Sequence, residues 1–321
     1  MEDLTQRLPH DLLADVLRRL QTTSPCSLAA SRCVCKTWCE VVDANRLIAD
    51  LLPHSLTGIF VHLDGETLPT HLSLDVSSTN MVPFDYLKTP DDKPLDGKCL
   101  KIKQHCKGLL LLTDVEWEEE WWVLNPATRQ WAHLPPSPPM CTPGMEDNAY
   151  AQSCDTFYHE NYLVFDPSVS LHYEVFLVKC IPSTPDISRF VECHIKRTEW
   201  PPSTYVLLVF SSRTKRWEER PFVREGEAAG TIGDLLEHTP PSHCFATYWA
   251  GALYFHQHDF ILRINLKNDK YQVIQPPEGV HWGDYPDHNL GKSENGVYCA
   301  RLGGHDGLRI RIWHLDETVI S

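Results

Sequence analysis

The sequence has no long apolar run. Residues 1–11 contain no apolar signal core, and no segment approaches the roughly 20 consecutive apolar residues that a membrane-spanning helix needs. We therefore expect neither a secreted protein nor a membrane protein. The 12 cysteines are scattered and show no disulfide framework, so we expect free thiols in a reducing compartment, cytoplasmic, nuclear or both.

The common catalytic and metal-binding motifs are also missing. There is no glycine-rich phosphate loop, no Gly-x-Ser-x-Gly turn and no His-Glu-x-x-His helix. The best metal candidates are Cys33, Cys35 and Cys39, but no second Cys or His pair accompanies them. His256 and His258 would share one face of a strand, although a solvated hairpin end explains them better. We expect no metal, no cofactor and no catalytic residue.

Positive charge is scarce. The chain has 29 Lys and Arg against 43 Asp and Glu, which gives a formal net charge of -14. Residues 1–50 carry only -1 of this, so nearly all the excess lies further along the chain. This balance disfavours nucleic acid and anionic membrane surfaces as partners. The 321 residues suffice for a small helical segment followed by one large domain or two ordinary ones.

The first 50 residues show a helical pattern. Between Pro9 and Leu20 the apolar side chains recur at helical spacing, and Pro9 suits a first helical turn. Ser27 can cap a second short helix, and a third pattern includes Val34 and Trp38. Three helices of this size bury too little surface to form a stable domain alone. We therefore expect them to pack against a partner or the remaining chain.

This stretch resembles an F-box. The matching residues are Leu8-Pro9, Leu12-Leu13, Val16-Leu17, Leu20, Ser27-Leu28, Arg32, Val34-Cys35-Lys36 and Trp38. Gln21 and Cys39 depart from the family pattern, but neither removes an apolar docking position. The resemblance implies docking to the Skp-type adaptor of a Skp–cullin–F-box ubiquitin ligase, a cullin-RING ligase. The adaptor-binding surface and the F-box core together would use Leu8, Pro9, Leu12, Leu13, Val16, Leu17, Leu20, Val34 and Trp38, and the sequence does not divide the two roles.

After residue 57 the helical period disappears. Short apolar runs, rich in Val, Leu and aromatic residues and bounded by turn formers, predict a mostly antiparallel β domain. The predicted strands include residues 59–63, 109–112, 121–124, 162–165, 173–178, 205–210, 252–255, 260–264, 296–300 and 308–313. We thus expect an F-box at residues 1–50, a linker at 51–57 and a β domain at 58–321.

A weak repeat runs through the predicted β domain. Strand-ending turns begin at residues 125, 166, 211, 265 and 316, with steps of 41, 45, 54 and 51 residues. An aromatic residue opens the next strand in four copies: Trp131, Tyr173, Trp217 and Tyr271. This period predicts a β-propeller of about six blades, with a β-sandwich as the alternative. We also expect residues 59–63 to pair beside residues 310–313 and close the ring, which would remove two exposed edges.

Two local patterns bear on this domain. Gly108-Leu109-Leu110, and the stretch from Asn125-Pro126 through Trp131 to Leu134-Pro135, resemble the kelch-like domain that follows the F-box in many plant proteins. The paired glycines of kelch repeats occur only once, at residues 303–304. The acidic and aromatic run at residues 116–122 could grip a basic peptide, but we favour a solvated hairpin whose tryptophans fill the core.

These resemblances imply a non-catalytic substrate receptor of a ubiquitin ligase. The F-box would dock the adaptor, and the β domain would hold a target protein while another subunit delivers ubiquitin, so the mechanism is proximity. One alternative is a β-propeller enzyme or small-ligand binder with a regulatory F-box. Another is a scaffold that binds the adaptor without directing degradation. The sequence does not identify the target protein.

Overall fold

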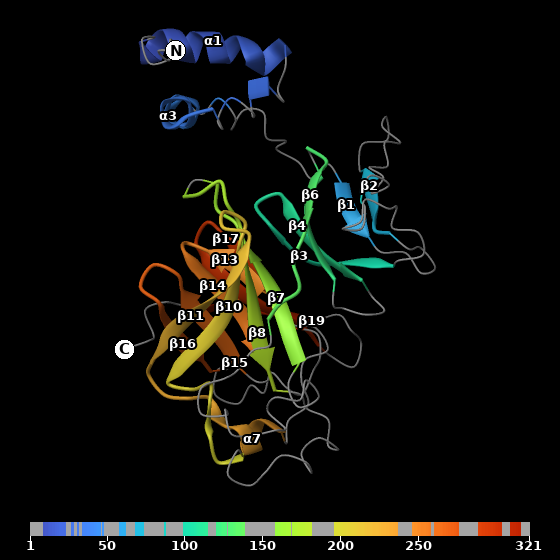
Figure 1. The fold of residues 1–321 in the computed structure, drawn as a ribbon, viewed down its shortest axis with the longest axis vertical. Coiled ribbons are helices and arrows are strands. Elements are labelled where there is room, and N and C mark those ends of the chain that lie inside the picture. Colours follow the sequence, from blue (N-terminus) through green and yellow to red (C-terminus); the bar gives the residue numbers. More distant parts are fainter. Residues whose placement is uncertain are drawn as a thin grey trace. The chain divides into compact units, whose positions relative to one another are not determined.

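The computed structural model divides the chain into two compact units, Met1–Phe84 and Asp85–Ser321 (Figure 1). Each unit is described by itself. The structure describes residues 9–23, 27–28, 31, 34–45, 47, 58–61, 68–73, 87, 99–114, 120–126, 128–138, 158–167, 169–181, 196–236, 246–257, 260–275, 288–303 and 309–315.

The first unit contains the predicted helices. Helix α1 spans His10–Thr23 and α3 spans Lys36–Ala44, and residues 27, 28 and 31 between them are also helical. Asp11 in the first turn of α1 complements the helix dipole. The core of this unit consists of Leu13, Ala14, Leu17, Leu28, Val41, Val42 and Leu47. Leu13 and Leu17 of the apolar stripe predicted for α1 therefore pack in this core, whereas Leu12 and Val16 of the same stripe are exposed.

A short antiparallel hairpin also belongs to the first unit. Strand β1 (Gly58–Val61) pairs with β2 (Thr70–Ser73), with Gly58 opposite Ser73 and Val61 opposite Thr70. The predicted pairing of residues 59–63 with residues 310–313 is therefore not confirmed, because β1 has β2 as its strand partner. The physical reason is loop closure: a partner nearby in sequence costs less chain entropy than one at the far end of the chain.

The second unit is built almost entirely of β-strands. A four-stranded sheet has the order β3-β4-β5-β6, and its strands span Leu100–Cys106, Leu109–Asp114, Trp121–Asn125 and Gln130–His133. An eight-stranded sheet has the order β13-β14-β15-β16-β11-β10-β8-β7. Its strands, in chain order, span Tyr158–Val164 (β7), Glu174–Cys180 (β8), Thr204–Ser211 (β10), Arg216–Glu225 (β11), Ala246–Trp249 (β13), Ala252–Gln257 (β14), Phe260–Asn265 (β15) and Lys270–Ile274 (β16).

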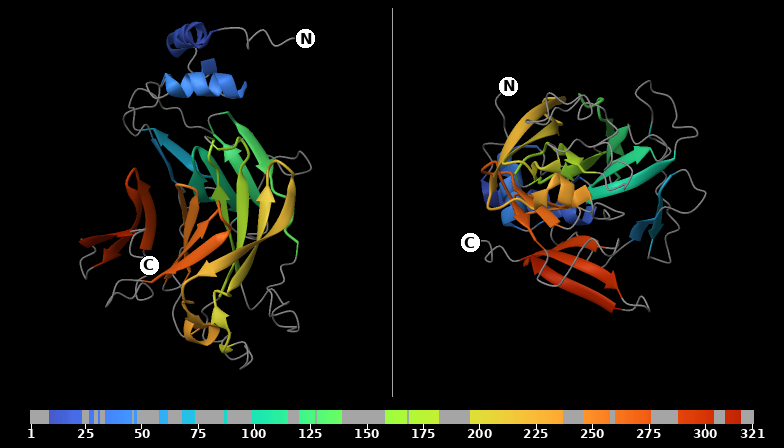
Figure 2. Two further views of the ribbon diagram at one scale, coloured as in Figure 1. Left: turned by 90° about the vertical axis from the view of Figure 1, so that its left-hand side faces the viewer. Right: turned by 90° about the horizontal axis from the view of Figure 1, so that it is seen from below.

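The described part of the second unit also contains three smaller elements. A three-stranded sheet, β17-β18-β19, spans His288–Ser293, Gly296–Gly303 and Arg309–Leu315. Its inner face packs on β14 and β15 through Val297, Cys299 and Leu315 against Tyr254 and Ile261 (Figure 2). Strands β9 (Glu199–Trp200) and β12 (Gly230–Thr231) pair with each other, and the short helix α7 spans Ile232–Leu236.

The structure confirms a helical N-terminal segment followed by an all-β domain, but it does not confirm a propeller. The eight-stranded sheet consists of two four-stranded antiparallel groups joined by one parallel pair, β11 with β16. In that pair Val223 lies opposite Lys270 and Glu225 lies opposite Gln272. About six separate blades were expected, and the described strands do not form such a set. The sequence pattern marks hairpins, whereas pairing between hairpin groups leaves no local signal.

Three of the five predicted repeat turns occupy equivalent positions. They connect β5 to β6, β10 to β11 and β15 to β16, each closed by a strand pair at its base: Asn125 with Gln130, Ser211 with Arg216, and Asn265 with Lys270. The predicted turn at Asp166 is different because it begins the connection between β7 and β8. The turn at Asp316 lies outside the described residues.

The side chain that begins each turn explains the repeat. Asn125 and Asn265 each accept a backbone N–H through Oδ1, from Thr128 at 3.3 Å and Lys267 at 3.0 Å. Ser211 Oγ accepts the backbone N–H of Arg213 at 3.3 Å. These bonds stabilise a turn locally. The last loop residue of each turn, Arg129, Lys215 or Asp269, then adopts a left-handed conformation, with φ of 55°, 59° and 55°.

Aromatic side chains dominate the core of the second unit. Trp122, Trp200, Tyr162, Tyr205 and Phe176 are among its largest fully buried residues. Trp121 is also buried, so the tryptophans at positions 121 and 122 fill the core as predicted. The other residues of the acidic run lie outside the described residues, except Glu120.

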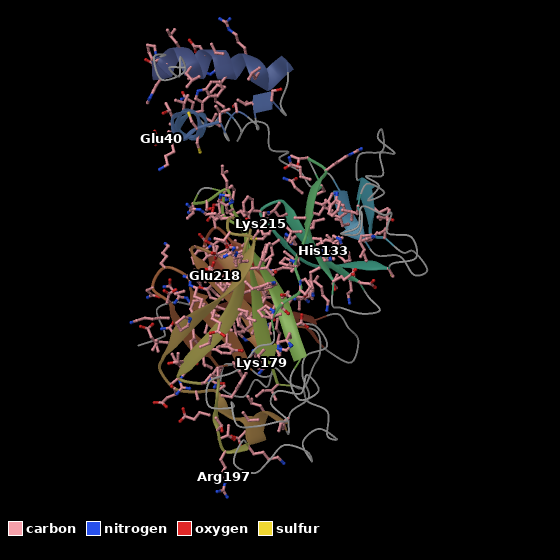
Figure 3. The ribbon with its side chains drawn as sticks, viewed as in Figure 1. Glu40, His133, Lys179, Arg197, Lys215 and Glu218 are labelled. Carbon is pink, nitrogen blue, oxygen red and sulfur yellow. The ribbon has the colours of Figure 1, made fainter. Side chains whose placement is uncertain are left out.

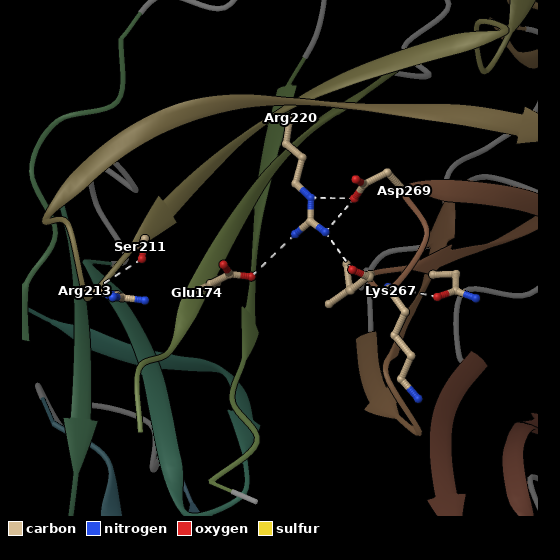
Figure 4. A network of polar contacts seen from close by, with 8 residues as sticks. Glu174, Ser211, Arg213, Arg220, Lys267 and Asp269 are labelled. Carbon is tan, nitrogen blue, oxygen red and sulfur yellow. Dashed lines mark hydrogen bonds and ion pairs between the residues drawn. The ribbon is translucent and has the colours of Figure 1, made fainter. Parts of the chain in front are cut away.

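Arg220 connects the two four-stranded groups. Its Nε donates to Asp269 Oδ1 at 2.8 Å, and its Nη2 donates to the backbone oxygen of Leu266 at 2.7 Å (Figure 4). On the other side, Nη1 lies 3.9 Å from a carboxylate oxygen of Glu174. Burial raises the pKa of Glu174, and the charge of Arg220 opposes that shift. One guanidinium group therefore contacts β8 and the β15–β16 turn from its position on β11.

We expect Arg220→Ala to destabilise the second unit. The variant loses charge-assisted hydrogen bonds and leaves Asp269 without this partner, which should lower the free energy of unfolding by about 1–2 kcal/mol. Urea unfolding followed by tryptophan fluorescence measures this change. Arg213→Ala is the control, since Arg213 is exposed in the neighbouring turn, and it should change stability by less than about 0.5 kcal/mol. Equal effects of the two variants would contradict the assigned role of Arg220.

A second prediction concerns the left-handed residue Lys215. Glycine adopts this conformation without the strain that a side chain imposes. Lys215→Gly should therefore raise the free energy of unfolding by about 0.5–1 kcal/mol. Arg213→Gly, in the same loop but at a residue with negative φ, should instead lower it. The same urea titration measures both, and a loss of stability in Lys215→Gly would show that the turn adopts another conformation.

Candidate functional site

Helix α1 presents apolar side chains in two directions. Leu13 and Leu17 are 1% and 0% exposed and lie in the core of the first unit. Leu12 and Val16 are 53% and 51% exposed. Because these two residues are four positions apart, they lie on the same face of the helix, one turn from each other. The helix therefore offers an apolar surface that its own unit does not cover.

The other predicted F-box residues that the structure describes are either partly buried against the core or exposed. Leu20 and Trp38 are partly buried against the core. Pro9 is exposed at the start of α1, and Val34 is exposed in the turn before α3. Leu8 lies outside the described residues. The core residues are thus Leu13, Leu17, Leu20 and Trp38, and the outward-facing residues, which we call the docking set, are Pro9, Leu12, Val16 and Val34.

A polar contact fixes α1 against the end of α3. Arg18 donates to Asp15 Oδ1 at 2.6 Å and to Asn45 Oδ1 at 3.4 Å. Asn45 in turn donates to the backbone oxygen of Val41 at 2.9 Å. Exposed ion pairs contribute little stability by themselves. The ion pair with Asp15 lies within α1, and the hydrogen bond from Arg18 to Asn45 supplies the polar link between α1 and the end of α3.

The sequence of this helical segment matches a known family. The F-box domain model matches residues 6–49. These residues form an F-box domain. F-box domains act in ubiquitin ligases of the Skp–cullin–F-box class and bind their Skp-type adaptor, and F-box proteins are generally non-catalytic adaptors of substrates. No curated protein matches the chain significantly.

Solved structures show only a distant likeness. The extracellular domain of the putative one component system BT4673 from B. thetaiotaomicron aligns at 10% identity and a TM-score of 0.29, over 66% of this chain and 20% of that one. The WD40 domain of SCAP from fission yeast gives 10% and 0.31, over 84% and 65%. The N-terminal domain of Nup159 gives 9% and 0.30, over 76% and 70%. At these values the likeness assigns neither a fold nor an activity.

The second unit contains an open groove of about 760 Å³, which lies beside the end of β6 and the turn between β10 and β11. Its lining residues are Glu120, Ala132, His133, Leu134, Pro135, Pro136, Phe210 and Lys215. His133 and Lys215 are labelled in Figure 3. Trp217 Nε1 donates to the backbone oxygen of Pro135 at 2.9 Å and so ties the wall of the groove to β11. The walls are mostly apolar, and Glu120 and Lys215 carry opposite charges. The groove is therefore better suited to binding an apolar side chain than to catalysing a reaction.

Phe210, which lines the groove, has Tyr173 as an aromatic neighbour. Tyr173 packs against Phe210, with ring centroids 6.4 Å apart, and its buried hydroxyl has no hydrogen-bond partner among the described residues. Burial raises the pKa of Tyr173 to about 12. A neutral phenol at such a pKa is a poor proton donor or acceptor near neutral pH. Tyr173 therefore supports the shape of the groove and has no acid–base role there.

Cys35, Cys39 and His256 are the metal candidates that the structure describes. Within the described residues there is no group of three or more His, Cys, Asp and Glu side chains suited to a metal ion. Cys35 and Cys39 lie one helical turn apart, joined by a backbone hydrogen bond of 3.0 Å, and Cys33 is outside the described residues. None of the described helices has the length and apolarity needed to cross a bilayer.

The prediction for His256 was wrong. It was expected at a solvated hairpin end, but it is buried and its Nε2 lies 3.8 Å from Cys299 Sγ. Burial raises the pKa of Cys299 to about 12, so this pair contains a thiol and no reactive thiolate at neutral pH. His258 lies outside the described residues. The alternation of the strand did not reveal the burial, because β17–β19 cover this face of β14 only in the tertiary structure.

Two tyrosine variants compare a buried hydroxyl without a partner with one that is hydrogen-bonded. Tyr173→Phe removes a buried hydroxyl that has no partner, so it should leave the free energy of unfolding unchanged or raise it by up to about 1 kcal/mol. Tyr205→Phe should lower it by about 1–2 kcal/mol, because the Tyr205 hydroxyl donates to the backbone oxygen of Lys179 at 2.6 Å. Chemical denaturation of both proteins at pH 7 gives the comparison.

The pKa of Tyr173 in the folded and unfolded chain predicts that stability depends on pH. The pKa of Tyr173 is about 12 in the folded chain and near its ordinary value of 10 when unfolded. The contribution of Tyr173 to the free energy of unfolding is therefore present in full below pH 10. It is lost as the pH rises through about 12. Tyr173→Phe should lose less stability than the wild type between these pH values. An unchanged slope would mean that the phenol is solvated in the folded chain.

Proposed function

We propose that the chain is the substrate-recognition subunit of a Skp–cullin–F-box ubiquitin ligase. The observation that carries the proposal is the outward apolar surface of an F-box helix, where Leu12 and Val16 are about half exposed. Exposed apolar side chains that share one surface are typical of a protein interface. In this role the docking set contacts the Skp-type adaptor, and Leu13 and Leu17 maintain the F-box core behind it.

The β unit is then the part that holds the target protein. Its large aromatic core and its groove provide a rigid frame with accessible surfaces. Ubiquitin transfer needs only that the target be held near the catalytic subunits, so the mechanism of this chain is proximity. The turn sequence at residues 125–135 supports the further proposal that this unit is related to the kelch-like domain of plant F-box proteins. We place the function in the cytoplasm, the nucleus or both.

Binding of the purified chain to a Skp-type adaptor tests the proposal. The wild type should be retained on immobilised adaptor, and the double variant Leu12→Asp, Val16→Asp should not, because two carboxylates would be buried without partners in the interface. The variant should keep the same unfolding midpoint as the wild type, since both side chains are exposed. Leu17 does not serve this test, because its substitution would disrupt the F-box core.

A matched control uses the same helix. His10→Asp introduces one carboxylate at an exposed polar position of α1 and should leave adaptor binding unchanged. The single variants Leu12→Asp and Val16→Asp should each weaken binding. A folded double variant that binds as tightly as His10→Asp would overturn the assignment of the docking surface. Failure of the wild type itself to bind would overturn the proposed function.

A further inference from the structure

Strand β19 has a free edge within the described part of the chain. In the second unit β5, β10 and β15 are each followed by a turn and a further strand, β6, β11 and β16, that pairs along their other side. Strand β19 holds the corresponding third place in its sheet, but it pairs with β18 alone among the described strands. Its backbone N–H and C=O groups on the other side are therefore positioned to receive another strand.

The outer face beside this edge is apolar. Ile310 and Ile312 are each 64% exposed. Alternate residues of the strand, Trp313 and Leu315, pack inward with the cluster on β14 and β15. His314 continues the outer face and lies against Tyr298, with ring centroids 4.8 Å apart. The pairing of β18 with β19 runs without a bulge from Val297 opposite Leu315 to Gly303 opposite Arg309. The edge therefore has none of the bulges or prolines that usually protect an exposed strand.

The charge of the strand indicates what kind of segment it would receive. Residues 309–315 contain two arginines, one histidine and no acidic residue, in a chain whose formal net charge is -14. Arg311 is exposed. A second copy of β19 would bring like charges together across the new pair, which disfavours self-association. An acidic segment would instead be complementary to this strand.

We propose that the free edge of β19 binds an extended, acidic segment of the target protein as a fourth strand. Main-chain hydrogen bonds would supply much of the affinity, and alternate apolar side chains of the segment would cover Ile310 and Ile312. Carboxylates of the segment would pair with Arg311. This inference rests on the proposed function for its biological meaning, and it adds the class of target and the surface that selects it.

A synthetic peptide with the sequence acetyl-EVEVEVE, labelled with fluorescein, tests the inference on the full chain. Fluorescence anisotropy should show saturable binding that weakens with added salt. We expect Ile312→Asp and Arg311→Glu each to weaken binding by about tenfold or more. The control Val169→Asp, at an exposed apolar residue in the β7–β8 connection, should bind as the wild type does.

A charge-reversed peptide sharpens the test. Acetyl-KVKVKVK should bind the wild type poorly and should bind Arg311→Glu more tightly than it binds the wild type. Amide hydrogen exchange in residues 309–315 should slow when the acidic peptide is present, because the free N–H groups become hydrogen-bonded. Binding that is equal in the wild type and Ile312→Asp would overturn the proposal, and so would protection confined to residues 132–136 of the groove. A dimer of the chain that Ile312→Asp dissociates would show self-association instead and would also overturn it.

Adaptor binding by the same preparations separates this inference from the proposed function. Wild type and Ile312→Asp should both be retained on the Skp-type adaptor, because the F-box is unchanged. Retention of both without any peptide binding would overturn the edge proposal and leave the proposed function standing. Peptide binding without adaptor binding would overturn the proposed function and, with it, the assignment of the peptide as a model of a ligase target.

Discussion

The parallel pairing of β11 with β16 is the constraint on which the β unit depends. It joins two antiparallel groups, each of which would otherwise end in an unpaired edge, into one continuous sheet of eight strands. Three residue pairs form the join, and two side-chain contacts cross it: Arg220 with Asp269, and Lys270 with Glu225. The groove lies beside β10, and the three-stranded sheet packs on β14 and β15. Their relative position depends on this join together with buried contacts between the two groups, such as Gln257 on β14 with Lys179 on β8.

The F-box uses one amphipathic helix for two purposes. A small unit of this kind cannot bury all of its apolar side chains within itself. Leu13 and Leu17 fill the core, and Leu12 and Val16 remain exposed, where a partner can cover them. Buried and exposed apolar residues thus lie next to each other along a single helix. This division explains how so short a segment can have both a packed core and an exposed apolar surface. A substitution of Leu12 changes the exposed surface, whereas a substitution of Leu17 disrupts the core.

In the β unit, the polar groups are mostly used for structure. Gln257 connects Trp200, Lys179 and Tyr205 in a buried network, and Arg224 holds Pro201 and Glu199. The titratable groups with the largest shifts, such as Tyr173 and Cys299, are shifted by burial toward their neutral forms. Such groups do not exchange protons near neutral pH.

The sequence by itself determined the F-box, the all-β class and the individual hairpins. These are local features: helical spacing fixes the stripe of α1, and Asn125, Ser211 and Asn265 close their turns with hydrogen bonds to backbone groups a few residues away. Only the tertiary structure decided which F-box residues face outward, since Leu12 and Leu13 have the same side chain and differ only in direction. It also decided that β11 meets β16 and that His256 is buried. Each of these depends on packing between segments distant in sequence, where many partners are sterically possible and the balance of buried area and chain entropy selects one.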